Sequence, residues 1–119
     1  MQVVGLRTRA FAGGTASAGL SVTGATLWGW ASYGEKGEPG SWVSLATNQT
    51  TAAMAPPYLP AAPGSVIDWQ AASSSEARRY LIDKQLSFQV RPSGTTGPNP
   101  NGARVALDYI EVRVRYLAP

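Results

Sequence analysis

The segment Arg104–Tyr116, R-V-A-L-D-Y-I-E-V-R-V-R-Y, has the most regular pattern in the chain. Apolar and charged side chains alternate along its second half: Ile110, Val112, Val114 and Tyr116 against Glu111, Arg113 and Arg115. Successive side chains of a β-strand point to opposite faces, so this pattern predicts a strand with one face against a core. Because no Gly or Pro interrupts the run and its Val, Ile and Tyr favour a pleated surface, we predict a central strand.

The residues around this segment predict how it begins and what it pairs with. Val105 and Leu107 have the opposite parity to Ile110, which predicts a β-bulge near Asp108–Tyr109. Upstream, apolar residues from Leu86 to Val90 alternate with polar ones until Pro92. We expect this strand and the C-terminal one to form an antiparallel hairpin through a loop at 92–103.

Five further segments are predicted to be strands: 3–11, 20–23, 25–31, 41–47 and 66–70. The Gly-rich tract 12–19 and the charged tract 34–40 are predicted to be turns. Ser73 and Glu76 have the spacing of a capping box, so 73–83 holds either one or two helical turns or a loop followed by a strand. Both interpretations stay open.

Residues 48–64 are rich in Ala and Pro and show no period, which predicts an extended loop or arm. Loops of this length are uncommon unless they bind something or reach a neighbour. The triplet Asn48-Gln49-Thr50 matches a glycosylation acceptor, a match that arises readily by chance.

These elements together predict an all-β fold. We expect one antiparallel β-sandwich domain over 1–119, jelly-roll-like, with one long Ala/Pro-rich loop and at most one short helix. A chain of 119 residues is long enough to bury a real core.

The composition argues against several partners. The net charge is only +3, and its cations are scattered rather than gathered into the basic patch that nucleic-acid binding needs. No run approaches the ~20 apolar residues of a membrane span, and the start does not resemble a signal peptide. Charged residues make up only 14% of the chain, which suits a surface buried against neighbouring proteins.

The residue types also argue against catalysis. The absence of His and Cys excludes imidazole and thiolate chemistry and most zinc sites. Lys36 and Lys84 lie in no motif that would activate a serine. A hydrolase that uses Asp68 and Asp83 is a minor hypothesis, because turn or cap carboxylates explain both. We therefore predict no enzyme, no cofactor and no metal site.

The tryptophans support a second functional hypothesis. Trp28 and Trp30 project from the same face of one predicted strand, either into the core or as a platform for sugar rings. Trp is highly buried on average, so at least two of the four are assigned to the core. Under the alternative of a glycan-binding module, the candidate contacts are Trp28, Trp30, Trp42 and Tyr58.

Two arginine pairs would form a basic stripe if the first and last strands were neighbours. They are Arg7 with Arg9, and Arg113 with Arg115. A solvated or subunit-facing sheet surface is the interpretation we favour for them.

The C-terminal third resembles a class of jelly-roll modules in tailed-phage virion proteins. The resemblance rests on two late strands and one early one: Phe88, Val90, Asp108, Ile110, Val112, Val114 and Tyr116, with the early strand approximated by Gly5-Leu6-Arg7-Thr8-Arg9-Ala10. Those modules usually carry strand material before the early element, where this chain has four residues. We therefore expect a partner subunit to supply the missing edge or the fold to be shortened.

What the resemblance implies, together with the low charge and the missing catalytic residue types, is a non-enzymatic virion protein. It would be a small capsid-decoration or minor tail subunit that contacts other virion proteins and forms a symmetric oligomer, with a trimer favoured. The candidate subunit contacts are Val3, Val4, Pro56, Pro57, Tyr58, Leu59 and Pro60.

Overall fold

The computed structural model describes residues 2–16, 21–49, 66–81, 85–95 and 103–117. These residues form six β-strands and one short helix: β1 (Gln2–Ala16), β2 (Gly24–Tyr33), β3 (Pro39–Thr47), β4 (Val66–Gln70), α1 (Ser74–Arg79), β5 (Phe88–Ser93) and β6 (Ala103–Leu117). All strand pairs are antiparallel. The predicted all-β class is therefore confirmed.

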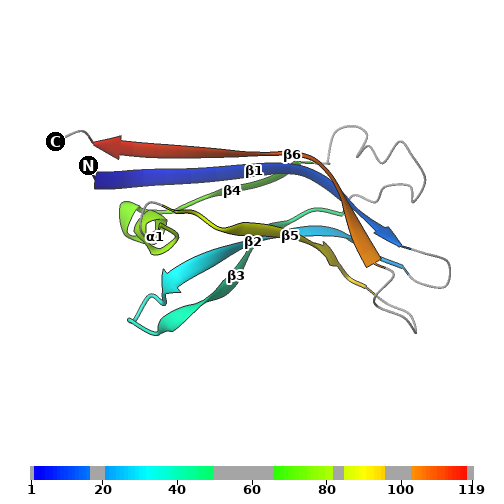
Figure 1. Ribbon diagram of the computed structural model, residues 1–119, viewed down its shortest axis with the longest axis horizontal. Coiled ribbons are helices and arrows are strands. Elements are labelled where there is room, and N and C mark those ends of the chain that lie inside the picture. The colour runs from blue at the N-terminus through cyan, green and yellow to red at the C-terminus, as the bar shows by residue number, and fades with distance from the viewer. Residues whose placement is uncertain (1, 17–20, 50–65, 82–84, 96–102, 118–119) are drawn as a thin grey trace.

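The strands form two sheets of three, which lie one above the other as two layers (Figure 1). The first sheet has the order β4-β1-β6 and the second has the order β3-β2-β5. β1 and β2 are thus the central strands, and the other four strands lie at sheet edges. The buried residues between the layers come mainly from β1, β2 and β4.

The longest pairing joins the two ends of the chain. β1 pairs with β6 from Gln2 opposite Leu117 to Ala16 opposite Ala103. The register shifts where Phe11 pairs with Tyr109 and Ala12 pairs with Leu107, so one residue of β6 is passed over. This confirms the bulge predicted near Asp108–Tyr109, and it returns the apolar residues on both sides of the bulge to one face.

Two predictions about β6 are wrong. It is an edge strand rather than a central one, and its partner is β1 rather than the strand that precedes it. That preceding strand, β5, pairs with β2 in the other sheet, so the two late strands form no hairpin. The reason is that alternation reports which face of a strand is apolar but not how many neighbours the strand has.

The glycine tract after Phe11 is a second correction. Residues 12–16 were predicted to be a turn, yet they continue β1. A Cβ on Gly14 would collide with the backbone of Gly24, and one on Gly24 would collide with the backbone of Asn48. These glycines therefore allow backbones to approach closely rather than supplying a bend.

The remaining elements lie close to their predicted bounds, with small differences. β2, β3 and β4 cover the predicted strands, and 35–38 forms the predicted turn. The predicted strand at 20–23 is only an isolated bridge at Ser21 among its described residues, and β5 begins at Phe88 and runs past Pro92 to Ser93. Most of the 48–64 arm and of the 92–103 loop lies outside the described residues.

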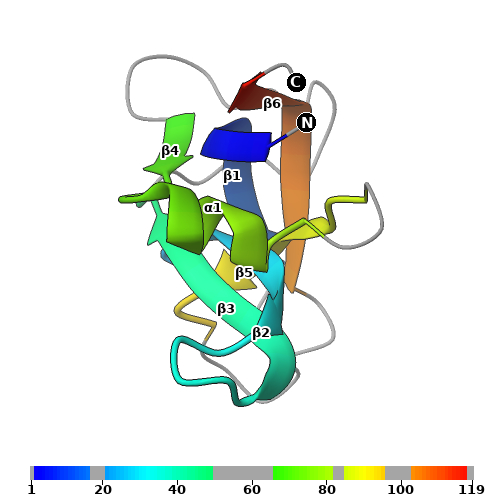
Figure 2. The same ribbon diagram turned by 90° about the vertical axis from the view of Figure 1, so that its left-hand side faces the viewer.

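Helix α1 packs at one end of the two layers (Figure 2). The side chain of Ser73 accepts a hydrogen bond from the Glu76 N–H, which caps the helix as the spacing predicted. Tyr80 follows the helix and meets Trp69 edge to face, with ring centroids 5.0 Å apart. Of the two open interpretations of this segment, the helical one is therefore correct.

Candidate functional site

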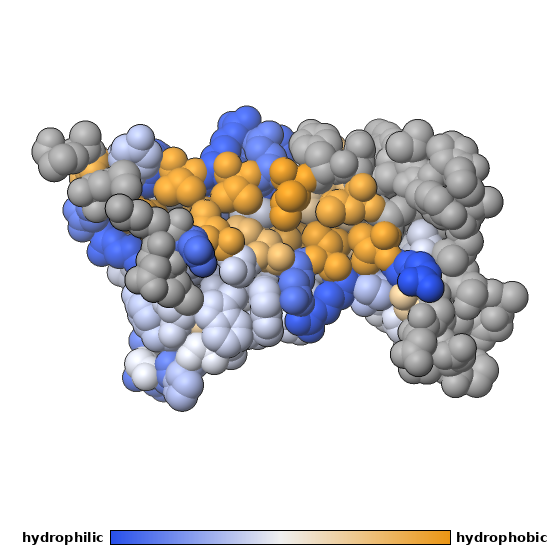
Figure 3. Space-filling model, viewed as in Figure 1, coloured by the Kyte–Doolittle hydropathy of each residue, from blue (hydrophilic) through white to orange (hydrophobic). Residues whose placement is uncertain are grey.

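One face of β6 is apolar and exposed. We call this surface the β6 strip: Leu107, Ile110, Val112, Val114 and Tyr116. Its side chains are between 37% and 55% exposed. Figure 3 shows the corresponding apolar band running along the molecule between the edges of the two sheets. Leu117, at the end of the strand, is also exposed.

The β6 strip is exposed because the second sheet does not reach beneath it. Val112 pairs with Thr8 and Ile110 pairs with Ala10, so the strip lies on the same face as the buried residues of β1. Thr8 and Ala10 are fully buried, whereas their β6 neighbours are about two fifths exposed (39% and 40%). The second sheet therefore covers β1 but not β6, which is the next strand outward in the first sheet. Contiguous apolar surface of this kind marks an interaction site.

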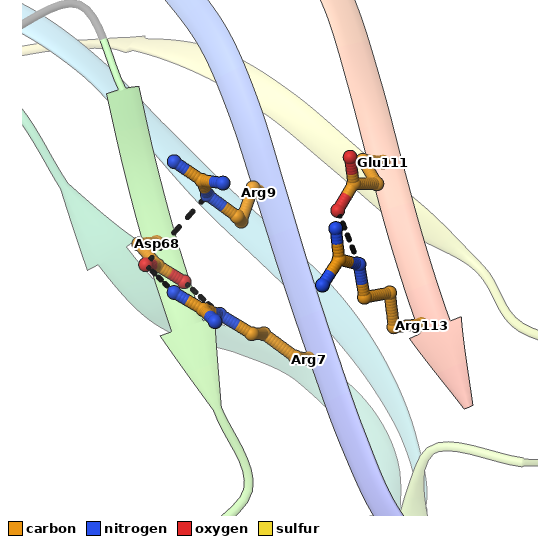
Figure 4. A network of polar contacts seen from close by, with 5 residues as sticks. All are labelled: Arg7, Arg9, Asp68, Glu111 and Arg113. Atoms are coloured by element: carbon orange, nitrogen blue, oxygen red, sulfur yellow. Dashed lines mark hydrogen bonds and ion pairs between the residues drawn. The ribbon is translucent and has the colours of Figure 1, made fainter. Parts of the chain in front are cut away.

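The opposite face of the same sheet is charged. Arg7 donates two hydrogen bonds to Asp68, at 3.0 and 2.6 Å, and Arg9 lies 3.8 Å from the same carboxylate (Figure 4). Glu111 pairs with Arg113 at 2.7 Å on β6. The hydrogen bonds from Arg7 hold the pKa of Asp68 below its ordinary value.

The predicted arginine pairs are therefore neighbours, as the stripe hypothesis required. Arg7 lies opposite Arg113, but Arg9 lies opposite Glu111 on one side and Asp68 on the other. Because carboxylates alternate with the guanidinium groups, this face carries mixed charge rather than a basic stripe.

The outer face of the second sheet carries three tryptophans. Trp28 and Trp30 lie on it together, and Trp42 lies directly opposite Trp30 with its ring edge-on at 5.6 Å. All three are half-buried. The guanidinium of Arg91 lies 4.6 Å from the centre of the Trp28 ring and 5.8 Å from that of Trp42. This Trp–Arg cluster is a packed surface layer, and only the fourth tryptophan, Trp69, lies in the core.

A hollow of about 370 Å³ lies at the edge of the Trp–Arg cluster. Its walls come from both tryptophans of the edge-on pair and from three residues nearby: Trp30, Trp42, Tyr80, Gln85 and Ser87. Burial raises the pKa of Tyr80, which keeps its hydroxyl neutral at physiological pH. Its described lining residues thus offer neutral polar groups and aromatic edges, with no charged side chain among them.

The predicted subunit contacts are only partly described. Val3 is buried in the chain's own core, where its carbonyl accepts a hydrogen bond from Arg78 at 3.1 Å. Val4 is half-buried. The five arm residues lie outside the described residues: Pro56, Pro57, Tyr58, Leu59 and Pro60. Their role in subunit contact stays a prediction.

The described residues contain no arrangement suited to the minor catalytic hypotheses. Asp68 is engaged by two arginines on an outer sheet face, and Asp83 and Lys84 lie outside the described residues. Lys36 lies in the exposed turn at 35–38. No group of three or more acidic residues in the described ranges could hold a metal ion, and no described helix is long and apolar enough to cross a membrane.

Comparisons with known proteins give no match: no protein-family model fits the chain, and neither a curated protein nor a solved structure resembles it closely enough to count. The functional argument therefore depends on the surfaces themselves. Of these, sequence reasoning found the tryptophans and the arginine pairs. It assigned the β6 strip to the core, because an apolar row looks the same in sequence whether another layer covers it or not.

Proposed function

We propose that this protein is a non-enzymatic structural subunit that works through protein–protein contact in a symmetric homo-oligomer. The observation that carries the proposal is the β6 strip, an apolar row on an edge strand whose residues are 37% to 55% exposed. Burying each side chain of such a row gives about 25 cal/mol per Å² of apolar surface. A chain that keeps this surface exposed gains that free energy only on association.

The resemblance to jelly-roll modules of tailed phages supports a more specific role. We infer a capsid-decoration or minor tail subunit, located in the virion and in contact with other virion proteins. A jelly roll has eight strands in two sheets, and six are described here. Association that adds strands at an open edge would complete such a sandwich, and a trimer remains the copy number that the resemblance favours.

The mass of the purified protein in solution tests the oligomer. Light scattering behind a sizing column should give a discrete multiple of 12.5 kDa. Val114→Lys places a charge in the β6 strip and should shift the mass toward one chain. Ser44→Lys adds the same charge on an exposed position of the second sheet and should leave the mass unchanged. A wild-type protein that stays a single chain at high concentration contradicts the proposal.

The virion role is tested in cells that produce the protein. An antibody against the protein should detect it in particles of virion size after sedimentation, rather than in the free protein fraction. Detection in the free fraction alone would leave the oligomer intact and remove the virion assignment.

A glycan-binding module is the second candidate, because the hollow beside Trp30 and Trp42 presents aromatic and neutral polar groups together. Sugar rings stack on open aromatic faces. The face of Trp28 is occupied by Arg91, which weakens this candidate. Quenching of tryptophan fluorescence by one member of a sugar panel, lost in Trp42→Ala, would support it over the structural role.

A further inference from the structure

The four edge strands differ in how they are protected against pairing with another chain. β4 has only five residues, β3 begins with Pro39, and β5 contains Pro92. Short strands and prolines are the ordinary means by which proteins block edge pairing. β6 has fifteen residues and no proline, so it is the one described edge without such a block. Apart from the bulge, it is a ready template for another strand.

We propose that β6 pairs antiparallel with β6 of a second copy, about a twofold axis through Val112. The proposal rests on the proposed function and deepens it by naming the contact and the register, and it makes the symmetric oligomer a pair in place of the trimer that the resemblance favours. The two first sheets would then join into one sheet with the order β4-β1-β6-β6-β1-β4. A twofold contact of this kind uses the same surface on both copies, so it closes as a pair.

The choice of register follows from which face is apolar. Opposite residues in an antiparallel pair lie on the same face of the sheet, so the pairing must join residues of equal parity to keep apolar beside apolar. The twofold axis must therefore pass through a residue of β6. The bulge at Asp108 interrupts the regular strand before Tyr109. Regular pairing is therefore available over 109–117, and the axis must lie near the middle of this range, at residue 112, 113 or 114.

The charged face of β6 distinguishes these positions of the twofold axis, because each position places different charged residues opposite one another. An axis at Val112 places Glu111 opposite Arg113 of the second copy, and it does so twice. An axis at Arg113 places that residue opposite its own copy, and an axis at Val114 places Arg113 opposite Arg115 twice. Cross-strand pairs of unlike charge stabilise a sheet and like pairs destabilise it. The Val112 axis leaves Arg115 opposite Tyr109 and, of these three positions, it is the one that places no like charges opposite each other.

The apolar face fits the same register. With the axis at Val112, Ile110 lies opposite Val114 of the second copy, so the two β6 strips run side by side. The five residues of each strip are contiguous and 37% to 55% exposed. Edge pairing would bury the adjoining flanks of the two strips together with the paired backbones, and the joined strips would form one wider apolar face on the pair.

The chain has no cysteine, so single cysteines can report the register directly. Opposite Cα atoms in an antiparallel pair are about 4.5–5.5 Å apart, within the range for a disulfide. Val112→Cys should therefore form a disulfide-linked pair under mild oxidation, visible on a non-reducing gel. Val112 is 39% exposed, so the substitution leaves the core untouched.

Two further variants serve as matched controls. Ile110→Cys and Val114→Cys should each stay largely unlinked alone, because each lies four residues from its own copy across the axis. An equal mixture of the two should link, since Ile110 and Val114 of different copies are opposite. Efficient linking of either single control, or no linking of Val112→Cys, overturns the proposed register.

The outcomes separate this inference from the proposed function. An oligomer by light scattering without the Val112→Cys link leaves the structural role standing and removes the twofold pairing, and a trimer would do the same. A single chain by light scattering removes both. Charge exchange adds an independent readout: Glu111→Arg should dissociate the pair, and Glu111→Arg with Arg113→Glu should restore it.

Discussion

The side-chain amide of Asn48 donates a hydrogen bond to the backbone carbonyl of Ala12 at 2.9 Å. Its amide oxygen accepts a hydrogen bond from the Ala25 N–H at 3.1 Å. Asn48 thus links β1 in the first sheet to β2 in the second at a buried position. Because its nitrogen is buried and used in this way, Asn48 is not a glycosylation acceptor in the folded chain.

Asn48→Ala should therefore be among the more costly substitutions outside the apolar core. It leaves a buried carbonyl and a buried N–H without this partner, which costs about 1–3 kcal/mol for each unsatisfied group. We expect a loss of at least ~2 kcal/mol in the free energy of unfolding, measured by guanidinium denaturation. Gln49→Ala, at the exposed neighbour, should change it little. Equal effects of both would contradict the bridging role.

Thr8 offers a change in the opposite direction. It is fully buried in the middle of β1, and its hydroxyl has no hydrogen-bond partner among the described residues. Thr8→Val keeps the shape and removes the unsatisfied group, so we expect a gain of about 1 kcal/mol in unfolding free energy. Thr8→Ser keeps the hydroxyl and removes a methyl, and it should destabilise the protein. A Val variant less stable than wild type would show that the hydroxyl is satisfied in solution.

Asp68 predicts a dependence of stability on pH. Its pKa is lowered in the folded state by the hydrogen bonds from Arg7, so its contribution is present above the unfolded value of about 3.9 and is lost as the pH falls through the lower folded value. Asp68→Asn should therefore be less stable than wild type at neutral pH, by a small amount because the pair is solvent-exposed. The difference should vanish in acid, when both proteins are unfolded with urea at about pH 2. A difference that persists there would point to packing rather than charge.

The local parts of this fold follow from the sequence. The strands, the bulge near Asp108 and the cap at Ser73 all depend on residues within a few positions of one another. Alternation, a change of parity and the Ser–Glu spacing report such short-range structure directly. These predictions hold because the backbone geometry of a strand or a helix start leaves few alternatives.

The parts that failed depend on long-range pairing. That β1 pairs with β6, at the other end of the chain, cannot be read from either strand alone. The exposure of Val112 follows from where the second sheet ends, and the pattern of β6 contains no trace of that limit. Gly14 was misassigned for the same reason, because the backbone that it approaches, at Gly24, belongs to the other sheet.

Arg91 decides whether the tryptophans are a structural layer or a ligand platform. Its guanidinium lies over Trp28 and beside Trp42, and it donates hydrogen bonds to Gln89. Arg91→Ala should lower the unfolding free energy by about 1 kcal/mol, as expected for a lost cation–π contact. It should also increase quenching of tryptophan fluorescence by acrylamide, because it uncovers a ring face.

Gln89→Ala is the matched control for this change. It removes the hydrogen bonds to Arg91 and leaves the guanidinium free to stay over Trp28, so acrylamide quenching should remain near the wild-type value. Under the structural interpretation, neither variant binds sugars. If Arg91→Ala loses sugar binding that the wild type shows, Arg91 belongs to a glycan site instead. If quenching does not rise in Arg91→Ala, the ring face of Trp28 is covered by something other than the guanidinium.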